Sequence, residues 1–420
     1  MLSALLLLTL VASAGVPELC PAALERGTRA TASGEWFAPI ELDAQALDTS
    51  PKGLASLRAV LGALAARGIL VVGLPTPDRT LVAPDAMLLQ PGDTWDPKAA
   101  ERAYKGLVAA FAASGVGVDL LDTARATPDY FFQRDPHLTP AGMQASAAVV
   151  AAAVRANPAA EGLPSATWAV RAGPDAVSDN VSGSVNKLCG TAVPPERFRS
   201  PLIDRTDLKQ RDEALFGDHY ADVVLLGTSQ SEPRLNFGGY LAAALETPVD
   251  IVAVSDGGPY GALLTYLESD TWRAHTPRVL LWEFPLWSAA PQRPGAVGSR
   301  PALIDPALPR RTVPLIQGRC EGAPVVGRLP AGTRSADLYL MPERAVSAIE
   351  LRFAKPVTVP VSAELYRADG AVERLNFASW RRVPARQRLT WSLAPGAPLA
   401  RAIVRVDTVA LVDAELYACP

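Results

Sequence analysis

A chain of 420 residues with 49% hydrophobic and 20% charged residues can bury substantial cores, and its length predicts two domains. Its net charge of -3 and a pI near 5.8 argue against a dedicated nucleic-acid-binding protein, which is usually basic. Bulk charge alone is therefore not expected to hold the substrate.

The sequence opens with an apolar run from Leu2 to Ala14. The run ends in Ala12-Ser13-Ala14, the small-x-small pattern of a signal peptidase site, and is too short to span a bilayer. It lacks the Lys or Arg that usually begins such a segment, and a short buried helix is the alternative. We expect residues 1–14 to be a cleaved signal peptide, which predicts a periplasmic or secreted protein.

Helical and strand-like patterns then alternate over about two thirds of the chain. Such alternation predicts an α/β domain with a mostly parallel sheet. The spacing of apolar residues predicts helices over Ser56–Arg67, Ala99–Ser114, Ala141–Arg155, Phe237–Leu245 and Gly261–Arg273, with strands over Ile69–Leu74, Val116–Leu121, Asp222–Leu226, Val249–Val254 and Arg278–Phe284.

Two stretches interrupt this pattern. Residues 157–201 are rich in Pro, Ser, Gly and Ala and predict an irregular insertion, while residues 289–319 have the Pro and Gly content of a linker. From Cys320 onward the sequence has short alternating segments, and Ala368-Asp369-Gly370-Ala371 indicates a hairpin. We therefore expect an α/β domain over 15–319 and an all-β sandwich over 320–420.

Four cysteines fit an oxidising compartment and allow three pairings. Cys20 and Cys189 fall in the expected α/β domain, whereas Cys320 and Cys419 bracket the β domain, which favours one disulfide in each domain. The sequence has no Cys-x-x-Cys or His-x-x-x-His spacing to indicate zinc, so no metal site is expected.

Three residues far apart in the sequence suggest a catalytic triad. The buried strand ending at Leu226 and Gly227 delivers Ser229 to the carboxyl edge of the sheet, where open α/β sheets place their sites. Asp135 and His137 lie on a loop before the helix that begins at Thr139-Pro140. At a spacing of two, Asp135 can orient the imidazole of His137 as it takes the serine proton.

The alternative is that Ser229 is an ordinary helix cap and Asp135 only caps a turn. The other two histidines, His219 and His275, lie in charged stretches without an orienting carboxylate motif. This leaves His137 as the histidine suited to act as a base.

These motifs resemble the AlgX/AlgJ-like polysaccharide O-acetyltransferases, a branch of the SGNH (GDSL-type) hydrolase fold. In that family an Asp-x-His-Trp-Thr motif precedes a Gly-Thr-Ser motif, and here Asp135-Pro136-His137-Leu138-Thr139 and Gly227-Thr228-Ser229 match in type and order. Leu138 replaces the usual Trp. Further family-like segments are Val71–Pro77, Asn236–Leu241, Asp256–Pro259 and Leu281–Pro285.

The resemblance implies an SGNH-like domain followed by a carbohydrate-binding module, with one disulfide in each domain. It also implies that Ser229 attacks an acetyl ester, with His137 as base and then acid. The backbone N–H of Ser229 or Gln230 is the expected first oxyanion donor, with Gly257, Gly258 or Asn236 as the second. A tight turn that needs positive φ is the alternative explanation of the two glycines.

Aromatic and basic residues gather in the sequence of the β domain. They mix rings that could stack on sugars with cations that could pair with carboxylates. For Trp391, within Leu389–Leu393, a position in the core is the favoured interpretation. The sugar-binding candidates are Trp380, Arg381, Arg382, Arg374 and Arg388.

The leading hypothesis is an O-acetyltransferase that acts on an acidic or neutral exopolysaccharide. A separate membrane-bound acyltransferase would supply the acetyl groups, and other polysaccharide-export proteins are the expected partners. No CoA-binding signature occurs in the sequence, and no cofactor is expected. The alternatives are a secreted carbohydrate acetylesterase with the same triad and a non-catalytic polysaccharide-binding scaffold.

Overall fold

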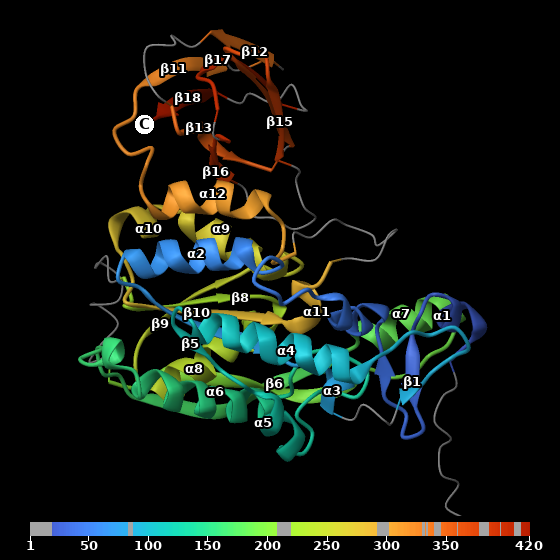
Figure 1. Ribbon diagram of the computed structural model, residues 1–420. Helices are drawn as coiled ribbons and strands as arrows, with labels where there is room; N and C mark the ends of the chain where they lie inside the picture. Colours follow the sequence, from blue (N-terminus) through green and yellow to red (C-terminus); the bar gives the residue numbers. More distant parts are fainter. Residues whose placement is uncertain are drawn as a thin grey trace, which may run out of the picture.

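The computed structural model consists of a larger α/β body and a smaller all-β body (Figure 1). The expected signal peptide lies outside the residues that the structure describes. Those residues are 19–82, 87–207, 220–291, 302–329, 332, 335–339, 346–358, 360–377, 386–394, 396–406 and 413–420.

A five-stranded sheet in the order β5-β3-β10-β8-β9 forms the centre of the α/β body, and all its neighbouring strands run parallel. Every residue of β3, β8 and β10 is buried, because layers cover both faces of the sheet. The predicted parallel sheet is confirmed. Its strands are β3 (Leu70–Thr76), β5 (Val116–Gly117), β8 (Val223–Gly227), β9 (Val249–Ala253) and β10 (Val279–Pro285).

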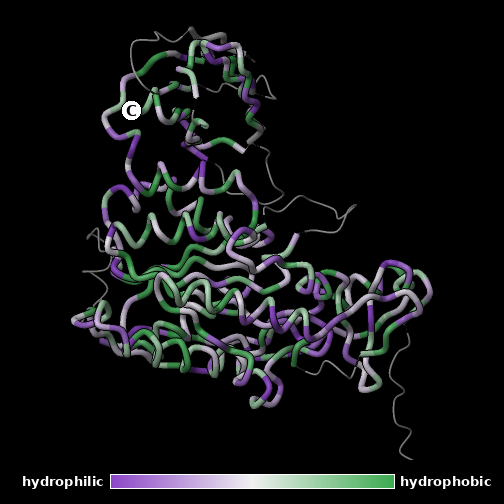
Figure 2. Tube along the Cα trace, viewed as in Figure 1, coloured by the Kyte–Doolittle hydropathy of each residue, from purple (hydrophilic) through white to green (hydrophobic). Residues whose placement is uncertain are grey.

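Helices cover the two faces of this sheet (Figure 1). Successive side chains of β10 point to opposite faces, so Trp282 packs with α2, α4, α9 and α12 while Leu281 packs with α6 and α8. Figure 2 shows hydrophobic residues concentrated along the central strands. The helices of these two layers are α2 (Ala55–Ala66), α4 (Pro97–Ala112), α6 (Pro140–Arg155), α8 (Phe237–Leu245), α9 (Gly261–Leu267) and α12 (Ala307–Ile316).

Short elements complete the α/β body. A three-stranded sheet in the order β2-β1-β4 lies near the N-terminal end of the described chain. Its strands are β1 (Arg29–Thr31), β2 (Trp36–Phe37) and β4 (Met87–Leu88). The short α-helices of the body are α1 (Pro21–Glu25), α3 (Arg79–Val82), α5 (Leu121–Ala126), α10 (Asp270–Ala274) and α11 (Leu286–Ala289). The 3₁₀ helices are η1 (Pro39–Leu42), η2 (Ala44–Ala46), η3 (Pro158–Ala160), η4 (Ser229–Ser231) and η5 (Gly258–Tyr260).

The bounds of most predicted helices and strands of the α/β body shift by one or two residues, and two elements differ further. The strand expected over Val116–Leu121 ends at Gly117, because the backbone N–H of Leu120 turns to the Tyr104 hydroxyl (2.7 Å). The helix expected over Gly261–Arg273 is two helices, α9 and α10. Ser269 separates them by accepting a hydrogen bond from Trp272 N (3.2 Å) as the N-cap of α10.

The expectation of an irregular insertion over 157–201 is wrong. The segment contains β6 (Trp168–Ser178), α7 (Asn180–Cys189) and most of β7 (Glu196–Arg205), and β6 pairs with β7 as an antiparallel ribbon. A register shift around Gly173-Pro174 breaks the alternation that identifies a strand. Helix α7 contains Asn, Ser and Gly, which are weak helix formers, so the composition of the segment did not indicate a helix.

The all-β body consists of two four-stranded antiparallel sheets, in the orders β11-β18-β13-β16 and β12-β17-β14-β15. Apolar residues of both sheets, including Trp391, form one core, which confirms the predicted β-sandwich and the position of Trp391. The predicted hairpin at 368–371 joins β14 to β15. The strands are β11 (Val325–Leu329), β12 (Ser335–Tyr339), β13 (Ala348–Val357), β14 (Val361–Arg367), β15 (Val372–Phe377), β16 (Arg386–Ser392), β17 (Leu399–Val406) and β18 (Ala414–Cys419).

The segment predicted as a linker contains helix α12, which packs on α2 in one body and on β16 in the other. Pro309 and Pro314 lie inside this helix and gave the segment its linker composition. Arg310 donates from Nε and Nη2 to the carbonyl of Ser392 at 3.0 and 2.7 Å, which joins α12 to the β body. This helix is therefore a packed joint between the bodies.

Two disulfides join Cys20 to Cys189 and Cys320 to Cys419, the pairing expected from the sequence. The first connects the N-cap of α1 to the end of α7, and the second connects the segment after α12 to the last strand. Within the described ranges, no helix has both the length and the apolar character needed to cross a membrane.

Candidate active site

Ser229 lies just beyond the carboxyl end of β8. The strand ends at Gly227, Thr228 is extended, and Ser229 begins the short helix η4. A Cβ atom at position 227 would overlap the side chain of Ser231, so only glycine fits at the base of this turn. The turn presents the Ser229 hydroxyl at the sheet edge that the sequence predicted.

The loop before α6 brings His137 to this serine. Phe132 N donates to His137 O (3.1 Å), and Thr139 caps α6 by accepting from Gly142 N (3.2 Å). The closed loop holds His137 Nε2 at 2.8 Å from Ser229 Oγ. Thr139 and Pro140 start the helix as predicted.

Asp135 is buried and binds the other side of the imidazole. Its Oδ1 is hydrogen-bonded to Nδ1 of His137 and also accepts from the backbone N–H of His137 (3.0 Å). Its Oδ2 accepts from Ser178 Oγ (2.6 Å) and Asn180 N (3.1 Å). Burial by itself raises the pKa of this carboxyl, but the hydrogen bonds and the neighbouring imidazole lower it to about 2.

Gln230 and Arg79 hold the loop that carries His137. Gln230 accepts from Leu138 N at 3.0 Å and donates to Pro136 O at 3.4 Å. Arg79 forms a buried ion pair with Glu41, and its guanidinium donates to the carbonyls of the loop residues Phe132 (3.0 Å) and Gln133 (2.8 Å). The loop is therefore fixed both to η4, which follows β8, and through Arg79 to the N-terminal segment that carries Glu41.

Glu283 is a fully buried carboxylate beneath the Ser229 turn. It lies on β10 and accepts from Thr228 N (2.8 Å), Thr228 Oγ1 (2.9 Å) and Ser231 Oγ (3.0 Å). Burial raises its pKa above the usual range, although these hydrogen bonds oppose the shift. No role was predicted for Glu283, although a charged residue inside the apolar run Val279–Phe284 is a signal that could have identified it.

The residues predicted as second oxyanion donors make structural contacts. Asn236 has a φ of 56° and caps α8, accepting from Gly239 N at 3.1 Å through its side-chain oxygen. Gly257 donates its N–H to Val254 O (3.1 Å), and Gly258 has a φ of +60° at the start of η5. These contacts agree with the tight-turn explanation of the two glycines.

Other predicted residues lie away from the triad or outside the described chain. Leu138, which replaces the family's Trp, is fully buried in the core beside α6. His275 is half-buried, stacked on Tyr220 and 3.4 Å from Asp222. His219 lies outside the described ranges.

The sugar-binding candidates are only partly described. Trp380, Arg381 and Arg382 lie outside the described residues. Arg374 is exposed and pairs with Glu364 at 3.4 Å. Arg388 is buried and donates to a carboxylate of the protein itself, Glu350.

A serine hydroxyl bonded to an imidazole, itself held by a buried carboxylate, can lose its proton as it attacks an acyl carbonyl. In the part of the chain that the structure describes, no cluster of three or more His, Cys, Asp or Glu side chains could hold a metal ion. The parallel sheet, with Ser229 at its carboxyl edge, places the chain in the SGNH hydrolase-like class.

Within this class the chain belongs to the AlgX family. Residues 35–286 match the family model described as the SGNH hydrolase-like domain of acetyltransferase AlgX. The alginate biosynthesis protein AlgX of Pseudomonas syringae pv. tomato is 28% identical over 333 residues, or 73% of this chain and 65% of that protein. The chain therefore spans about two thirds of the length of this relative.

Two solved structures are similar to this fold. The structure of Pseudomonas aeruginosa AlgX matches 96% of this chain and 100% of its own, with a TM-score of 0.79 and 22% identity. The O-acetyltransferase domain of Pseudomonas putida AlgJ matches 62% of this chain and 91% of its own, with a TM-score of 0.50 and 25% identity. The first match covers both the α/β and the β body, as expected from the sequence.

Proposed function

We propose that the chain is a polysaccharide O-acetyltransferase that works through an acetyl-serine intermediate on Ser229. The observation that carries this proposal is the 2.8 Å contact between His137 Nε2 and Ser229 Oγ, with Asp135 on the opposite ring nitrogen. Membership of the AlgX family supports acetyl transfer as the reaction.

In the first half of the reaction, Ser229 Oγ attacks the acetyl carbonyl while His137 Nε2 takes the hydroxyl proton. The tetrahedral oxyanion collapses, and the donor oxygen leaves with the proton from His137. In the second half, His137 removes the proton of a sugar hydroxyl as that oxygen attacks the acetyl-serine. The new acetyl ester leaves, and the proton returns to Ser229.

The oxyanion needs hydrogen-bond donors at the same edge of the sheet. The N–H groups of Ser229 and Gln230 open helix η4, and N–H groups in a first helical turn have no acceptor within their own helix. Losing one such donor typically costs about 10²–10³ in rate. We assign the first donor to Gln230 N–H and leave Asn236 and Gly258 as candidates for the second.

The acceptor is proposed to be an acidic exopolysaccharide of the alginate type, because relatives in sequence are named alginate biosynthesis protein AlgX and probable alginate O-acetylase AlgJ. The two disulfides fit an oxidising, extracytoplasmic compartment. We propose residues 15–319 as the catalytic domain and 320–420 as a carbohydrate-binding module. Acetyl groups would come from a membrane-bound acyltransferase, within a larger polysaccharide-export assembly.

Mass spectrometry of the purified protein, incubated with a small acetyl ester, tests the proposal. An acetyl group is expected on Ser229 in the wild type and in Ser362→Ala, a control serine on β14. No acetyl group is expected in Ser229→Ala or His137→Ala.

Added oligosaccharides separate the alternatives. Transfer of the acetyl group from Ser229 to the sugar supports the transferase. Release only as acetate would indicate an esterase, whose triad is the same. Absence of any acetyl-serine with several donors would favour a binding scaffold and reject the catalytic proposal.

A further inference from the structure

Arg79 is a buried arginine whose five N–H groups all bind acceptors inside the protein. It follows strand β3 and begins the short helix α3. Its Nε and Nη2 donate to the two carboxylate oxygens of Glu41 at 2.8 and 2.6 Å, and Nη2 also donates to Trp36 O at 2.6 Å. Its Nη1 donates to the carbonyls of Phe132 (3.0 Å) and Gln133 (2.8 Å). The guanidinium is thus fully used within the fold.

These acceptors come from two segments that lie against each other. Trp36 and Glu41 belong to an N-terminal segment, residues 34–42, whereas the two carbonyls bound by Nη1 belong to the loop that carries His137. The segments also bind directly, because Trp36 N donates to Gln133 O at 3.0 Å. The guanidinium carbon of Arg134 lies 5.3 Å from the centre of the Trp36 ring. Arg79 therefore joins the N-terminal segment to the loop of the triad.

Glu41 supplies the charge that balances Arg79 in this buried place. Its carboxylate is 1% exposed and accepts a further hydrogen bond from Ala38 N at 2.8 Å. Burial opposes the charge of Arg79, but Glu41 and, after it, Asp135 raise the pKa of the guanidinium above its ordinary value. Arg79 therefore stays cationic, and its charge favours the ionised form of Asp135.

A second buried carboxyl, that of Asp78, lies beside this ion pair. Burial, and then the charge of Glu41, raise the pKa of Asp78 well above its ordinary value, which favours the neutral form. Its Oδ1 accepts from Trp287 N at 3.2 Å, which fixes the start of α3 to α11. Arg79 is thus presented from an anchored backbone and is paired with one carboxylate.

The carbonyls that Arg79 binds lie close to the triad in the chain. Gln133 is two residues before Asp135, and Phe132 N donates to His137 O at 3.1 Å. The two bonds of Nη1 therefore fix the start of the turn that carries Asp135 and His137. Gln230 holds the same turn from the side of the serine. A displacement of about 1 Å in such a unit can cost about 10²-fold in rate.

We infer that Arg79 and Glu41 form a positioning pair, which holds the loop of His137 against Ser229 from the N-terminal segment. Neither residue touches the reacting atoms in this arrangement. The pair acts through the backbone of Phe132 and Gln133, and the segment 34–42 thereby gains a role at the triad. The effect on catalysis rests on the proposed function, whereas the placement of the loop is a property of the fold.

Replacing both charges together separates positioning from stability. Loss of Arg79 alone leaves Glu41 as an unpaired buried charge, whereas neutral groups of similar size in place of a buried pair are often tolerated. The Arg79→Met/Glu41→Gln protein should therefore unfold in urea near the wild-type midpoint. Its kcat for 4-nitrophenyl acetate should nevertheless fall about 10²-fold, with little change in KM, because the loop loses its donors.

Arg125→Met is the matched control. Arg125 donates to Leu81 O of the same helix α3 at 3.0 Å and to Glu101, so its loss should leave the loop of His137 in place and kcat unchanged. Arg79→Lys is the conservative variant. It keeps a charge beside Glu41 but has only three donors on one nitrogen, so it should stay folded and still lose most of the kcat.

Proton NMR reports the placement of the loop without turnover. The hydrogen bond between His137 Nδ1 and Asp135 should give a resonance far downfield of the amides in the wild type and in Arg125→Met. This resonance should broaden or disappear in Arg79→Lys and in the double variant. It should be lost in Asp135→Asn, which identifies it.

Two results would overturn the inference. The first is a folded Arg79→Lys or double variant that keeps both the wild-type kcat and the downfield resonance. The second is a kcat that falls only in proportion to the folded fraction, because the pair would then contribute stability alone. If the wild type neither becomes acetylated on Ser229 nor cleaves any ester, the proposed function fails, and the resonance still decides whether the pair places the loop.

Discussion

Ser229 Oγ lies 2.8 Å from His137 Nε2, although 92 residues separate the two in the chain. Each residue is placed by a different part of the fold, Ser229 by the end of β8 and His137 by the loop that opens α6. Gln230, next to the serine, binds the backbone on both sides of His137. The serine and the histidine are therefore held as one unit.

Replacing Asp135 with Asn should lower kcat for a small acetyl ester about 10⁴-fold with little change in KM. The amide can no longer hold the imidazole in the tautomer that accepts the serine proton. The same replacement in other serine triads lowers kcat by about this factor. Steady-state kinetics with 4-nitrophenyl acetate measures it. Asp129→Asn is the control, because Asp129 is exposed and its left-handed φ of 51° suits Asn.

The stability of the protein should fall in acid partly through Asp135. Its folded-state pKa of about 2 lies below the usual 3.8, so the ionised carboxylate stabilises the fold above pH ~4, and that contribution is lost as the pH falls towards 2. The contribution is about 2 kcal/mol.

Urea unfolding at a series of pH values tests this contribution. Asp135→Asn should be less stable than the wild type near pH 6, and the two proteins should converge near pH 2. A constant difference between them across this range would contradict the assigned role of the carboxylate, and Asp129→Asn should follow the wild type throughout.

The sequence predicted the elements whose patterns are local. A β-branched run closed by Gly227 located β8, and Thr139-Pro140 located the start of α6. Parallel strands have their carboxyl ends at one edge, so the meeting of Ser229 and His137 could be expected. The all-β body followed from period-2 segments in the same way.

The partners of the triad could not be predicted, because they depend on tertiary contacts. Ser178 and Asn180 reach Asp135 from the segment that composition marked as irregular. The ion pair between Arg388 and Glu350 likewise depends on strand pairing, because 38 residues separate the two in the chain. The turn at Asp256–Gly258 fits both a structural and a catalytic role, and its spacing alone cannot separate them.

Glu283 is predicted to be a positioning residue for Ser229. In Glu283→Ala the Thr228 N–H and the Ser231 hydroxyl lose their buried acceptor, and a displaced serine should lower kcat about 10²-fold. Glu283→Gln keeps an oxygen for the Thr228 N–H and should retain most of the activity. Kinetics with 4-nitrophenyl acetate measures both variants, and an unchanged kcat in Glu283→Ala would rule out the role.

Glu283 should also make the stability of the protein depend on pH, which a comparison of Glu283→Gln with the wild type tests. Burial raises the folded-state pKa of Glu283, so its contribution to stability is greatest at low pH and falls as the pH rises. Glu283→Gln has no proton to lose and should gain stability relative to the wild type as the pH rises. A gap between the two proteins that stays constant or narrows would contradict the assigned direction.

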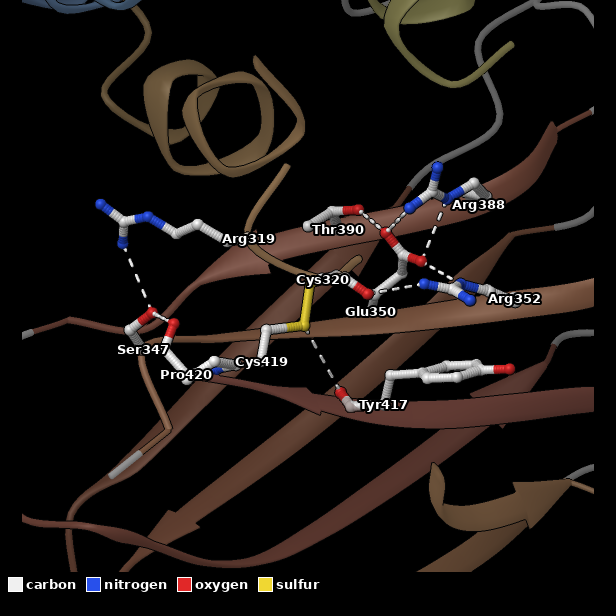
Figure 3. Close-up of a disulfide and its surroundings, with 10 residues drawn as sticks. All are labelled: Arg319, Cys320, Ser347, Glu350, Arg352, Arg388, Thr390, Tyr417, Cys419 and Pro420. Carbon is white, nitrogen blue, oxygen red and sulfur yellow. Dashed lines mark hydrogen bonds and ion pairs between the residues drawn. A yellow bond between two sulfur atoms is a disulfide. The ribbon is translucent and has the colours of Figure 1, made fainter. Parts of the chain in front are cut away.

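The two disulfides should differ in their effect on the catalytic step. Cys189 ends α7, and that helix begins beside Ser178 and Asn180, which bind Asp135. Cys320 and Cys419 instead belong to the β body, where Arg352 donates both to the Cys320 carbonyl and to Glu350 (Figure 3). Only the first disulfide is connected to the triad through a short structural path.

We expect the Cys20→Ser/Cys189→Ser protein to lose about tenfold in kcat for a small ester, because a loosened α7 weakens the hydrogen bonds that orient Asp135. The Cys320→Ser/Cys419→Ser protein should keep its kcat while losing a comparable stability, typically about 2–5 kcal/mol for a native disulfide. Urea unfolding and ester kinetics on both proteins measure the two effects. Equal losses of kcat in the two proteins would contradict this path. Loss of the Cys320–Cys419 disulfide would then disturb the triad as much as loss of the Cys20–Cys189 disulfide, and both would act only through global stability.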